Sequence, residues 1–502
     1  MVDTANPGGA APALLAPGRL LIDGAWVDAA DGATLTAFNP ATGAPAAVVA
    51  EAGPEDVDRA VRAARAAFDE GPWTRMQPAA RERLLLRLAD LIEAEAGEIA
   101  RIETLNQGKP LSISKGDAAR GAATFRYFAG WITKAGGRTL PVSPPNGHAP
   151  LVYTRPEPVG VVAQIIPWNF PFAMACRMLA PALAAGCCVV LKPAEQTPLT
   201  ALLLGELLVK AGIPAGVVNI LPGHGRRAGE ALVRHAGVDK IAFIGSTAVG
   251  KQIAAVAGAQ MKRVSLELGG KNPAIAFADA DPRKVAAWAA NAIFFNAGQV
   301  CTSASRLYVH DAVYEPVMEA LVELAGRLVV APGNEPTAAM GPLVSRDHLA
   351  RVSGYVDQAR EAGARLLAGG GRPGALPAGT EDGYFFAPTI FCDVPESARL
   401  LREEVFGPVL AVSRWSDEGQ VIAAANDTQY GLAAGMFTQR LATAHKAAAA
   451  LKAGIVWVNA FNILDPSAPF GGMKQSGIGR DLGEEGLLEY LETKTVWVDL
   501  DQ

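Results

Sequence analysis

The sequence predicts an α/β fold, in which parallel strands form sheets that helices cover on both faces. Two observations lead to this prediction. Short apolar runs rich in β-branched residues alternate with longer segments of helical periodicity along most of the chain. The apolar runs lack the in-and-out alternation of half-exposed strands, so we expect both faces of each strand to be buried.

The order of the elements predicts two α/β units in succession. Helical patterns cover residues 56–69 and 79–104, and further helices are expected at 198–211, 229–236 and 249–258. Strands are expected between them, at 159–166, 188–191, 217–221 and 241–244. A second series begins near Val264, with a strand at 273–277, a helix at 282–295 and a strand at 306–309, and its alternation runs on to Val458. The Glu-Leu-Gly-Gly segment at Glu267 suggests the crossover between the two units.

Three segments fall outside this alternation. Residues 1–18 are rich in Ala, Pro and Gly without a basic leader, which indicates a flexible N-terminal tail. Residues 138–156 and the Thr-, Val- and Trp-containing stretch at 493–498 are typical of extended edge strands. Since an edge strand exposes unpaired backbone groups, a partner subunit could cover either of them.

Composition and charge exclude several classes of protein. Among the 502 residues, 45 are Lys or Arg and 50 are Asp or Glu, and the charges are interspersed, so no basic stripe for a nucleic acid is expected. Every apolar run is broken too early to span a membrane. Five cysteines are too few for a disulfide scaffold in a chain of this size, which favours reduced thiols and a cytoplasmic location. Metal-ligand spacings such as CxxC and HExxH are missing, so we expect no metal.

One cysteine stands in a sequence environment that suits a nucleophile. Cys301 follows an expected helix and lies among small and polar residues, Asn296-Ala-Gly-Gln-Val before it and Thr-Ser-Ala-Ser after it. A thiol with an ordinary pKa of about 8.5 is mostly protonated at neutral pH, so a working nucleophile needs local activation. An inert buried thiol is the alternative, and it fits Cys187 and Cys188 within their apolar strand.

At Cys301 the sequence resembles the aldehyde dehydrogenase superfamily. Residues 295–306 resemble its nucleophile segment, and Leu266-Glu-Leu-Gly-Gly-Lys-Asn-Pro273 resembles its general-base segment at a fitting distance along the chain. Other matching motifs follow in the family's order: Pro167-Trp-Asn-Phe-Pro171, Lys192-Pro-Ala-Glu-Gln-Thr-Pro198, Phe243-Ile-Gly-Ser-Thr-Ala-Val-Gly250, Glu404-Val-Phe-Gly-Pro408 and Pro469-Phe-Gly-Gly472. The resemblance covers residues 20–498.

The resemblance implies a catalytic set of three residues. Cys301 would attack the aldehyde to give a thiohemiacetal, which loses a hydride and becomes a thioester. The Asn169 side-chain amide and the Cys301 backbone N–H would form the oxyanion site. Glu267 would activate the water that hydrolyses the thioester, and the leucines beside it predict partial desolvation of its carboxylate. Because relatives that transfer the acyl group to coenzyme A lack this base, Glu267 favours hydrolysis to a free acid.

The resemblance also implies an atypical Rossmann-like domain that binds NAD. A strand-to-helix turn at Gly245 and Ser246 would meet the pyrophosphate, and Glu195 with Lys192 would bind the adenosine ribose. A carboxylate at that place repels a 2′-phosphate, so NAD is favoured over NADP, although the family contains members that use both. The predicted cofactor residues are Ile165, Ile166, Pro167, Trp168, Lys192, Glu195, Gly225, Phe243, Gly245, Ser246, Val249, Leu268, Glu404 and Phe406.

The sequence departs from the family in the pocket for the aldehyde. Many relatives have Trp-Lys where this chain has Arg177-Met178, and Asp481 stands where a later Glu is expected, so a Lys–Glu proton relay does not carry over. His348 replaces a Gln often found near the nicotinamide ribose. Arg177 resembles the carboxylate-binding Arg of semialdehyde dehydrogenases, whereas the rest of the wall favours hydrophobic or aromatic aldehydes. The predicted pocket residues are Phe170, Met174, Arg177, Val300, Thr302, Phe461, Leu464 and Phe470.

These expectations give a division of the chain and two further hypotheses. Residues 19–137 and 157–266 would form the NAD-binding domain, 267–476 the catalytic domain, and 138–156 with 485–502 a small β extension for assembly into a homodimer or homotetramer. A protein of the same fold that binds without turnover is one alternative, and an acyl transfer to coenzyme A is another.

Overall fold

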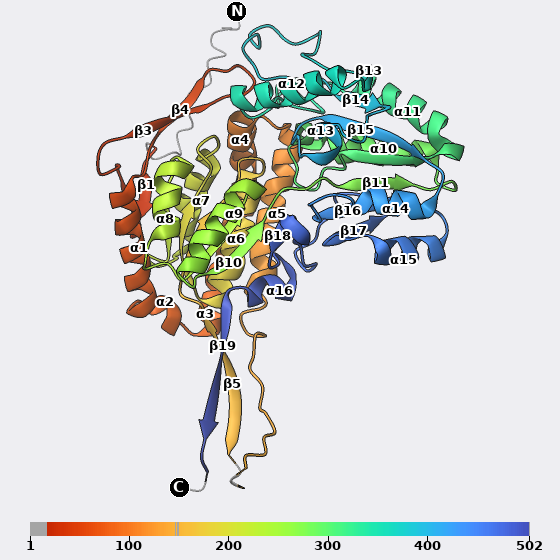
Figure 1. Cartoon of the computed structure of the whole chain (residues 1–502). Coiled ribbons are helices and arrows are strands. Elements are labelled where there is room, and N and C mark those ends of the chain that lie inside the picture. The colour runs from red at the N-terminus through yellow and green to blue at the C-terminus, as the bar shows by residue number, and fades with distance from the viewer. Residues whose placement is uncertain (1–17, 146, 148–149, 501–502) are drawn as a thin grey trace, which may run out of the picture.

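The computed structural model describes residues 18–145, 147 and 150–500, and it contains two large sheets with their helices and a projecting two-stranded arm (Figure 1). The expected α/β class is confirmed. The N-terminal tail predicted for residues 1–18 lies, apart from Gly18, outside the described residues.

The first sheet has a parallel centre with antiparallel strands at both margins. Its order is β18 (Gly477–Ile478), β10 (Arg263–Glu267), β9 (Lys240–Ile244), β6 (Val161–Ile165), β7 (Cys188–Lys192), β8 (Val218–Ile220), β1 (Leu20–Ile22) and β2 (Ala25–Val27). The run from β10 to β8 is parallel throughout. Strands β6 to β9 confirm the four apolar runs of the sequence, and all of their residues are buried.

The second sheet is built in the same manner from the following part of the chain. Its order is β13 (Arg365–Ala368), β14 (Thr389–Cys392), β15 (Val409–Trp415), β12 (Arg306–His310), β11 (Pro273–Ala276), β16 (Ala433–Phe437) and β17 (Ile455–Val458). All neighbours are parallel except β13 and β14. A separate hairpin pairs β3 (Thr34–Phe38) with β4 (Pro45–Ala50). The chain therefore leaves one sheet at Glu267 and enters the next at Pro273.

Helices cover both sheets. Those packed around the first are α1 (Pro54–Asp69), α2 (Pro72–Arg75), α3 (Pro78–Ala94), α4 (Ala96–Gln107), α5 (Leu111–Ala129), α6 (Pro171–Ala185), α7 (Leu199–Ala211), α8 (Glu230–Arg234), α9 (Thr247–Ala259) and α16 (Gly483–Leu488). Those around the second are α10 (Pro282–Phe294), α11 (Tyr314–Arg327), α12 (Arg346–Glu361), α13 (Arg399–Arg402), α14 (Glu418–Asn426) and α15 (Leu441–Ala450).

The single helix expected at 79–104 is wrong, because two helices meet at Glu95. This residue has φ −97° and ψ 11°, outside helical geometry, and its carbonyl accepts the Ile99 N–H at 3.0 Å to begin α4. Helical periodicity continues across the break, since both helices bury their apolar faces in the same core.

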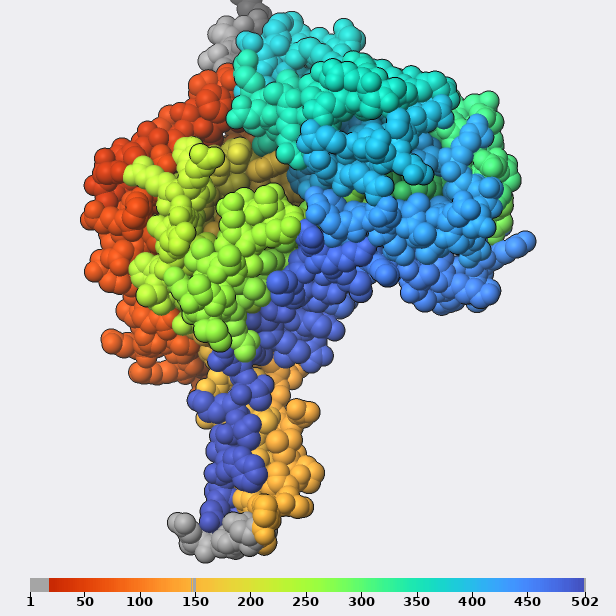
Figure 2. All heavy atoms as spheres, in the orientation of Figure 1, coloured from red at the N-terminus to blue at the C-terminus, as the bar shows by residue number. Residues whose placement is uncertain are grey.

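The two unusual segments of the sequence pair with each other to form the arm. Strand β5 (Leu151–Pro158) runs antiparallel to β19 (Leu491–Val498), and the pair projects from the body (Figures 1 and 2). The predicted extent is corrected at both segments. Residues 138–140 only accompany β5 through backbone hydrogen bonds, and residues 485–488 belong to α16, which packs on α6.

The arrangement leaves a cleft between the two sheets. The carboxyl ends of β6, β9 and β10 reach it from the first sheet, and α12 reaches it from the second. Figure 2 shows a hollow in the surface between the yellow-green α8–α9 region and the teal α12 region. Loops at the carboxyl ends of parallel strands are the usual place for a ligand in open α/β sheets.

Candidate active site

Cys301 forms part of the wall of two cavities, and this is the central feature of the site. One cavity, of about 190 Å³, lies in the cleft, and the other, of about 390 Å³, lies beyond Cys301 among apolar side chains. Cys301 and Met174 line both. A ligand in either cavity can therefore reach the thiol from its own side.

The loop that carries Cys301 has an unusual backbone. After α10, Asn296, Ala297 and Gly298 adopt left-handed conformations in succession, with φ of 49°, 55° and 70°. A Cβ on Gly298 would come within 2.1 Å of the Gly407 carbonyl oxygen, so only glycine fits there. Such backbone strain persists where the surroundings hold it, and here it turns the chain sharply ahead of the nucleophile.

Asn272 fastens the nucleophile loop to the second sheet. Its Nδ2 donates to the Cys301 carbonyl at 2.8 Å and to the Ser303 carbonyl at 3.0 Å, while its Oδ1 accepts the Ala433 N–H at 3.0 Å. The sequence analysis did not single out this residue, although it lies within the general-base motif.

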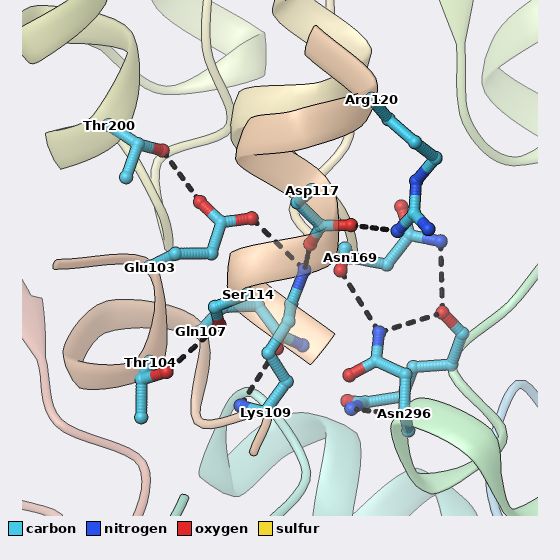
Figure 3. A network of polar contacts seen from close by, with 11 residues as sticks. Glu103, Thr104, Gln107, Lys109, Ser114, Asp117, Arg120, Asn169, Thr200 and Asn296 are labelled. Atoms are coloured by element: carbon cyan, nitrogen blue, oxygen red, sulfur yellow. Dashed lines mark hydrogen bonds and ion pairs between the residues drawn. The ribbon is translucent and has the colours of Figure 1, made fainter. Parts of the chain in front are cut away.

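The predicted oxyanion residue, Asn169, lies in the loop between β6 and α6 and contacts the same nucleophile loop. Its Nδ2 donates to the Gln299 carbonyl at 2.9 Å, and its backbone carbonyl accepts from Asn296 Nδ2 at 3.0 Å (Figure 3). The side chain is almost fully buried and its Oδ1 has no partner among the described residues. The amide is thus oriented by protein groups and keeps one N–H for a ligand.

Glu267 ends β10 and its carboxylate lies next to the Cys301 thiol. Burial raises the pKa of Glu267 to about 7, the Arg177 guanidinium acts in the opposite direction, and the Asp481 carboxylate raises it further. Burial and the negative charge of Glu267 also hold the pKa of Cys301 well above its usual range. The thiol is therefore protonated at neutral pH, and Glu267 is the neighbouring base of suitable pKa to take its proton.

Residues from the second sheet form the opposite wall of the cleft cavity. Glu404 is half-buried, its Oε1 accepts the Gly270 N–H at 2.9 Å, and desolvation raises its pKa to about 7. Burial lowers the pKa of His348 to about 4, so its ring is neutral and shares a 2.7 Å hydrogen bond with the Phe406 carbonyl. The His348 and Trp168 rings pack edge to face, with 5.0 Å between their centroids.

The predicted cofactor residues collect at the carboxyl ends of the first sheet. Those that line the cleft cavity are Pro167, Trp168, Gly245, Ser246, Leu268, Glu404 and Phe406, together with Ile244, Gly269, His348 and Arg351, of which Ile244, Gly269 and Arg351 escaped the sequence analysis. Ser246 caps α9, with its Oγ accepting the Val249 N–H at 3.4 Å. The others do not line this cavity. They lie at or just after the ends of β6, β7, β8 and β9 or, for Val249, in the first turn of α9: Ile165, Ile166, Lys192, Glu195, Gly225, Phe243 and Val249.

Lys192 and Glu195 follow β7 and form an ion pair of 3.5 Å between Nζ and Oε2. Lys192 is buried, which lowers the pKa of its ammonium group, and its Nζ also donates to the Pro193 carbonyl at 2.9 Å. Glu195 keeps about a third of its side chain exposed. The carboxylate can therefore accept hydrogen bonds from a ligand in the cleft.

All of the predicted pocket residues line the larger cavity. They are Phe170, Met174, Arg177, Val300, Thr302, Phe461, Leu464 and Phe470. The cavity also includes Arg120, Ala173, Trp288, Asn291, Phe295, Asn462 and Ile463, which the sequence analysis missed. Phe170 and Phe295 stack with 6.1 Å between ring centroids. Most of the wall is aromatic or aliphatic.

Arg177 forms an ion pair with Asp481. Its Nε lies 3.1 Å from Asp481 Oδ2, and its guanidinium lies 4.2 Å above the centre of the Phe470 ring. Both partners of the ion pair are largely buried. The pair thus places a balanced charge beside Glu267, with Arg177 next to the position where relatives have the Lys and Asp481 where they have the Glu.

The geometry unites a thiol, a base, an amide donor and a cleft at the ends of parallel strands, and the comparisons with known proteins agree with it. A sequence model of the aldehyde dehydrogenase family matches residues 26–496. The chain belongs to the aldehyde dehydrogenase family. Its relatives include phenylacetaldehyde dehydrogenase of Pseudomonas fluorescens, 48% identical over 96% of this chain and 95% of the relative, and human retinal dehydrogenase 2, 45% identical over 96% and 92%.

Solved structures of aldehyde dehydrogenases have the same fold. An NAD+ complex of aldehyde dehydrogenase from Bacillus cereus is 46% identical and superimposes with a TM-score of 0.93, covering 97% of each chain. Betaine aldehyde dehydrogenase from Staphylococcus aureus in complex with NAD+ is 39% identical, with a TM-score of 0.94 over 97% of this chain and 95% of the other. Within the described residues of this aldehyde dehydrogenase, no helix is long and apolar enough to cross a membrane.

Proposed function

We propose that this aldehyde dehydrogenase uses NAD+ to oxidise a hydrophobic or aromatic aldehyde to the carboxylic acid. The observation that carries the proposal is the position of Cys301 between the cleft cavity and the apolar cavity. The aldehyde occupies the apolar cavity, and the cofactor occupies the cleft. The thiol meets both at the point where they come together.

The proposed reaction uses the three residues around this point. Glu267 takes the proton of the Cys301 thiol, and the sulfur then adds to the aldehyde carbon. The Asn169 amide and the Cys301 N–H stabilise the oxyanion. NAD+, when bound, supplies the hydride acceptor. After Glu267 has released its first proton to solvent, it takes a proton from a water molecule, which attacks the thioester carbonyl. The acid is released, the Cys301 thiolate leaves, and the proton on Glu267 returns to the sulfur.

The residues around the cleft fit NAD. Ser246 caps a helix of 13 residues whose N-terminus attracts a pyrophosphate, and the half-buried Glu404 offers a carboxylate to a ribose. Glu195 would accept hydrogen bonds from the adenosine ribose and repel a 2′-phosphate, which favours NAD over NADP. Parallel assays with the two cofactors test this preference.

The substrate class follows from the apolar wall and from Arg177. A relative 48% identical to this chain is named phenylacetaldehyde dehydrogenase. The alternative, a semialdehyde dehydrogenase whose Arg177 binds a carboxylate, is less favoured because Asp481 already pairs with that guanidinium. An aromatic or aliphatic body packs against Phe170, Phe461 and Phe470.

The remaining parts of the proposal concern organisation. Residues 19–137 and 157–266 bind NAD, residues 267–476 supply the nucleophile, and the arm of β5 and β19 joins copies of the chain into a dimer or tetramer. All five cysteines are free, which fits a reducing compartment such as the cytoplasm.

The decisive experiment is the replacement Cys301→Ala. The variant should form no NADH from any aldehyde, because the thiohemiacetal cannot form. Cys392→Ala is the matched control, since that buried thiol lies in β14 away from both cavities. NADH formation by Cys301→Ala would overturn the proposal. Release of free acid without added coenzyme A separates hydrolysis from acyl transfer.

A further inference from the structure

The wall of the larger cavity has a buried apolar part and an exposed part. Phe461 and Phe470 are nearly inaccessible to solvent, whereas Ile463 and Leu464 are exposed. Arg120 belongs to this exposed part, with 47% of its side chain exposed. Cys301 and Arg120 line the same cavity, so one elongated substrate in it has both side chains available.

A buried network holds Arg120 in place. Lys109 Nζ lies 3.0 Å from Glu103 Oε1 and 2.7 Å from Asp117 Oδ2, and all three side chains are fully buried. Thr200 Oγ1 donates to Glu103 at 2.8 Å, and Arg120 Nη2 pairs with the second oxygen of Asp117 (Figure 3). Because Asp117 is bound by two cations and cannot reach water, the geometry of Arg120 is set by the interior.

The same network contacts the apolar wall. The Lys109 ammonium lies 4.3 Å from the centre of the Phe170 ring, which stacks on Phe295, and both rings line the cavity. The same buried network therefore contacts both the aromatic wall of the cavity and Arg120.

Arg120 keeps donors free for a ligand on a side chain that solvent reaches, whereas the unpartnered Nε and Nη2 of Arg177 are buried beside Asp481. The only partner of Arg120 among the described residues is Asp117, through Nη2, and that carboxylate is shared with Lys109. Arg177 is buried against Asp481 and Phe470. A guanidinium with free N–H groups at the end of an apolar cavity matches a carboxylate on an elongated apolar substrate.

We propose that Arg120 selects aldehydes whose apolar body ends in a carboxylate, with the aldehyde at Cys301 and the carboxylate at the outer end of the cavity. This inference rests on the proposed function and names a substrate class for it. The apolar middle of the substrate lies against Phe170 and Phe461. The acid produced then carries two carboxylates, so a reaction that consumes dicarboxylic acids must follow.

The experiment compares two series of straight-chain aldehydes of increasing length, one unsubstituted and one ending in a carboxylate. We expect kcat/KM to favour the carboxylate series over a limited range of lengths, by on the order of 10-fold for a charge-assisted contact at a half-exposed site. Arg120→Met should remove the preference, because kcat/KM for the carboxylate series should fall by more than kcat/KM for the unsubstituted series. Arg120→Lys should restore part of the preference.

Arg126→Met is the matched control, because Arg126 lies on the same helix and pairs with Asp90 and Glu93 away from the cavity. No preference for a carboxylate at any length would overturn the inference, and so would a preference that survives in Arg120→Met. An equal loss on both series would show a structural role and would overturn it too. Oxidation of the unsubstituted series by the wild-type protein tests the proposed function separately.

Discussion

The burial of Glu267 acts on catalysis and on stability in opposite directions. A carboxyl with a pKa of about 7 is a competent base at neutral pH. The same burial makes the ionised group costly in the folded protein. Kinetic assays measure the effect on catalysis, and unfolding experiments measure the effect on stability.

Replacing Glu267 should remove the base that activates the hydrolytic water. Glu267→Gln should keep the hydride step if another group or solvent accepts the thiol proton, but the thioester should accumulate. A burst of NADH followed by a slow steady state is expected in stopped-flow absorbance. In the wild-type protein the steady-state rate should rise through about pH 7, where Glu267 loses its proton, and this rise should vanish in the variant. A pH profile identical to that of the wild type would contradict the assignment.

The stability prediction has the opposite sign. The folded pKa of Glu267 is about 7 and its ordinary value is 4.5, so wild-type stability falls as the pH rises between these values. Glu267→Gln lacks this fall and should unfold at a higher denaturant concentration above neutral pH, by up to about 3 kcal/mol. Near pH 5 the two midpoints should nearly coincide. Equal midpoints at both pH values would argue against the raised pKa.

Among the elements, the loop after α10 has the strictest backbone requirement. Asn296 to Gly298 reverse the chain so that Cys301 meets Asn169 and Glu267 from a different direction than the helix would give. The strain is held by Asn272, which binds the carbonyls of Cys301 and Ser303.

Gly298→Ala tests this requirement. The added Cβ would meet the Gly407 carbonyl at 2.1 Å at a φ of 70°, so the loop must move. We expect kcat to fall by about 100-fold with the fold retained, as for a displacement near 1 Å. Gly326→Ala on α11 is the control, because nothing lies near its Cβ position and alanine suits a helix. Unchanged kcat in Gly298→Ala would show that the loop tolerates another path.

An element can be predicted from the sequence when residues close together in the chain determine it. It cannot when the determining contacts come from residues far apart in the chain. The runs that became β6, β7 and β9 were predictable because both faces of each strand are buried, so most of their residues are apolar and the turn residues stand out. The catalytic residues were predictable because each lies in a short sequence motif of the family. Arg120 carried no such signal, since its importance depends on contacts with a cavity whose other residues lie far along the chain.

For the whole molecule, the arm is the feature on which the proposed self-association rests. Its strands leave Trp497 at 57% and Leu151 at 42% exposure on a two-stranded sheet, which alone has little core. The sequence predicted extended segments at both ends of this pair, but not that they pair with each other, because strand register is decided by residues more than 300 positions apart, as for Val152 and Trp497.

Trp497→Asp should weaken self-association without unfolding the protein. A charge on an apolar contact surface is costly when a partner covers it. Sedimentation velocity should show the wild type as a dimer or tetramer and the variant shifted toward the single chain. Met261→Asp is the control, since Met261 is 91% exposed on the body of the protein. Equal sedimentation of wild type and Trp497→Asp would exclude the arm as the contact.

The buried trio of Glu103, Lys109 and Asp117 also limits how this protein can evolve. Replacing Lys109 leaves two buried carboxylates without their shared cation, which typically costs about 3–5 kcal/mol, and replacing either carboxylate removes one of the two partners of a buried ammonium group. Replacing all three by apolar residues can instead be nearly neutral. Single mutational steps from this arrangement therefore lead through unstable proteins. We therefore expect the three residues to be kept or replaced together. The contacts that hold Arg120 and Phe170 should be kept or lost with them.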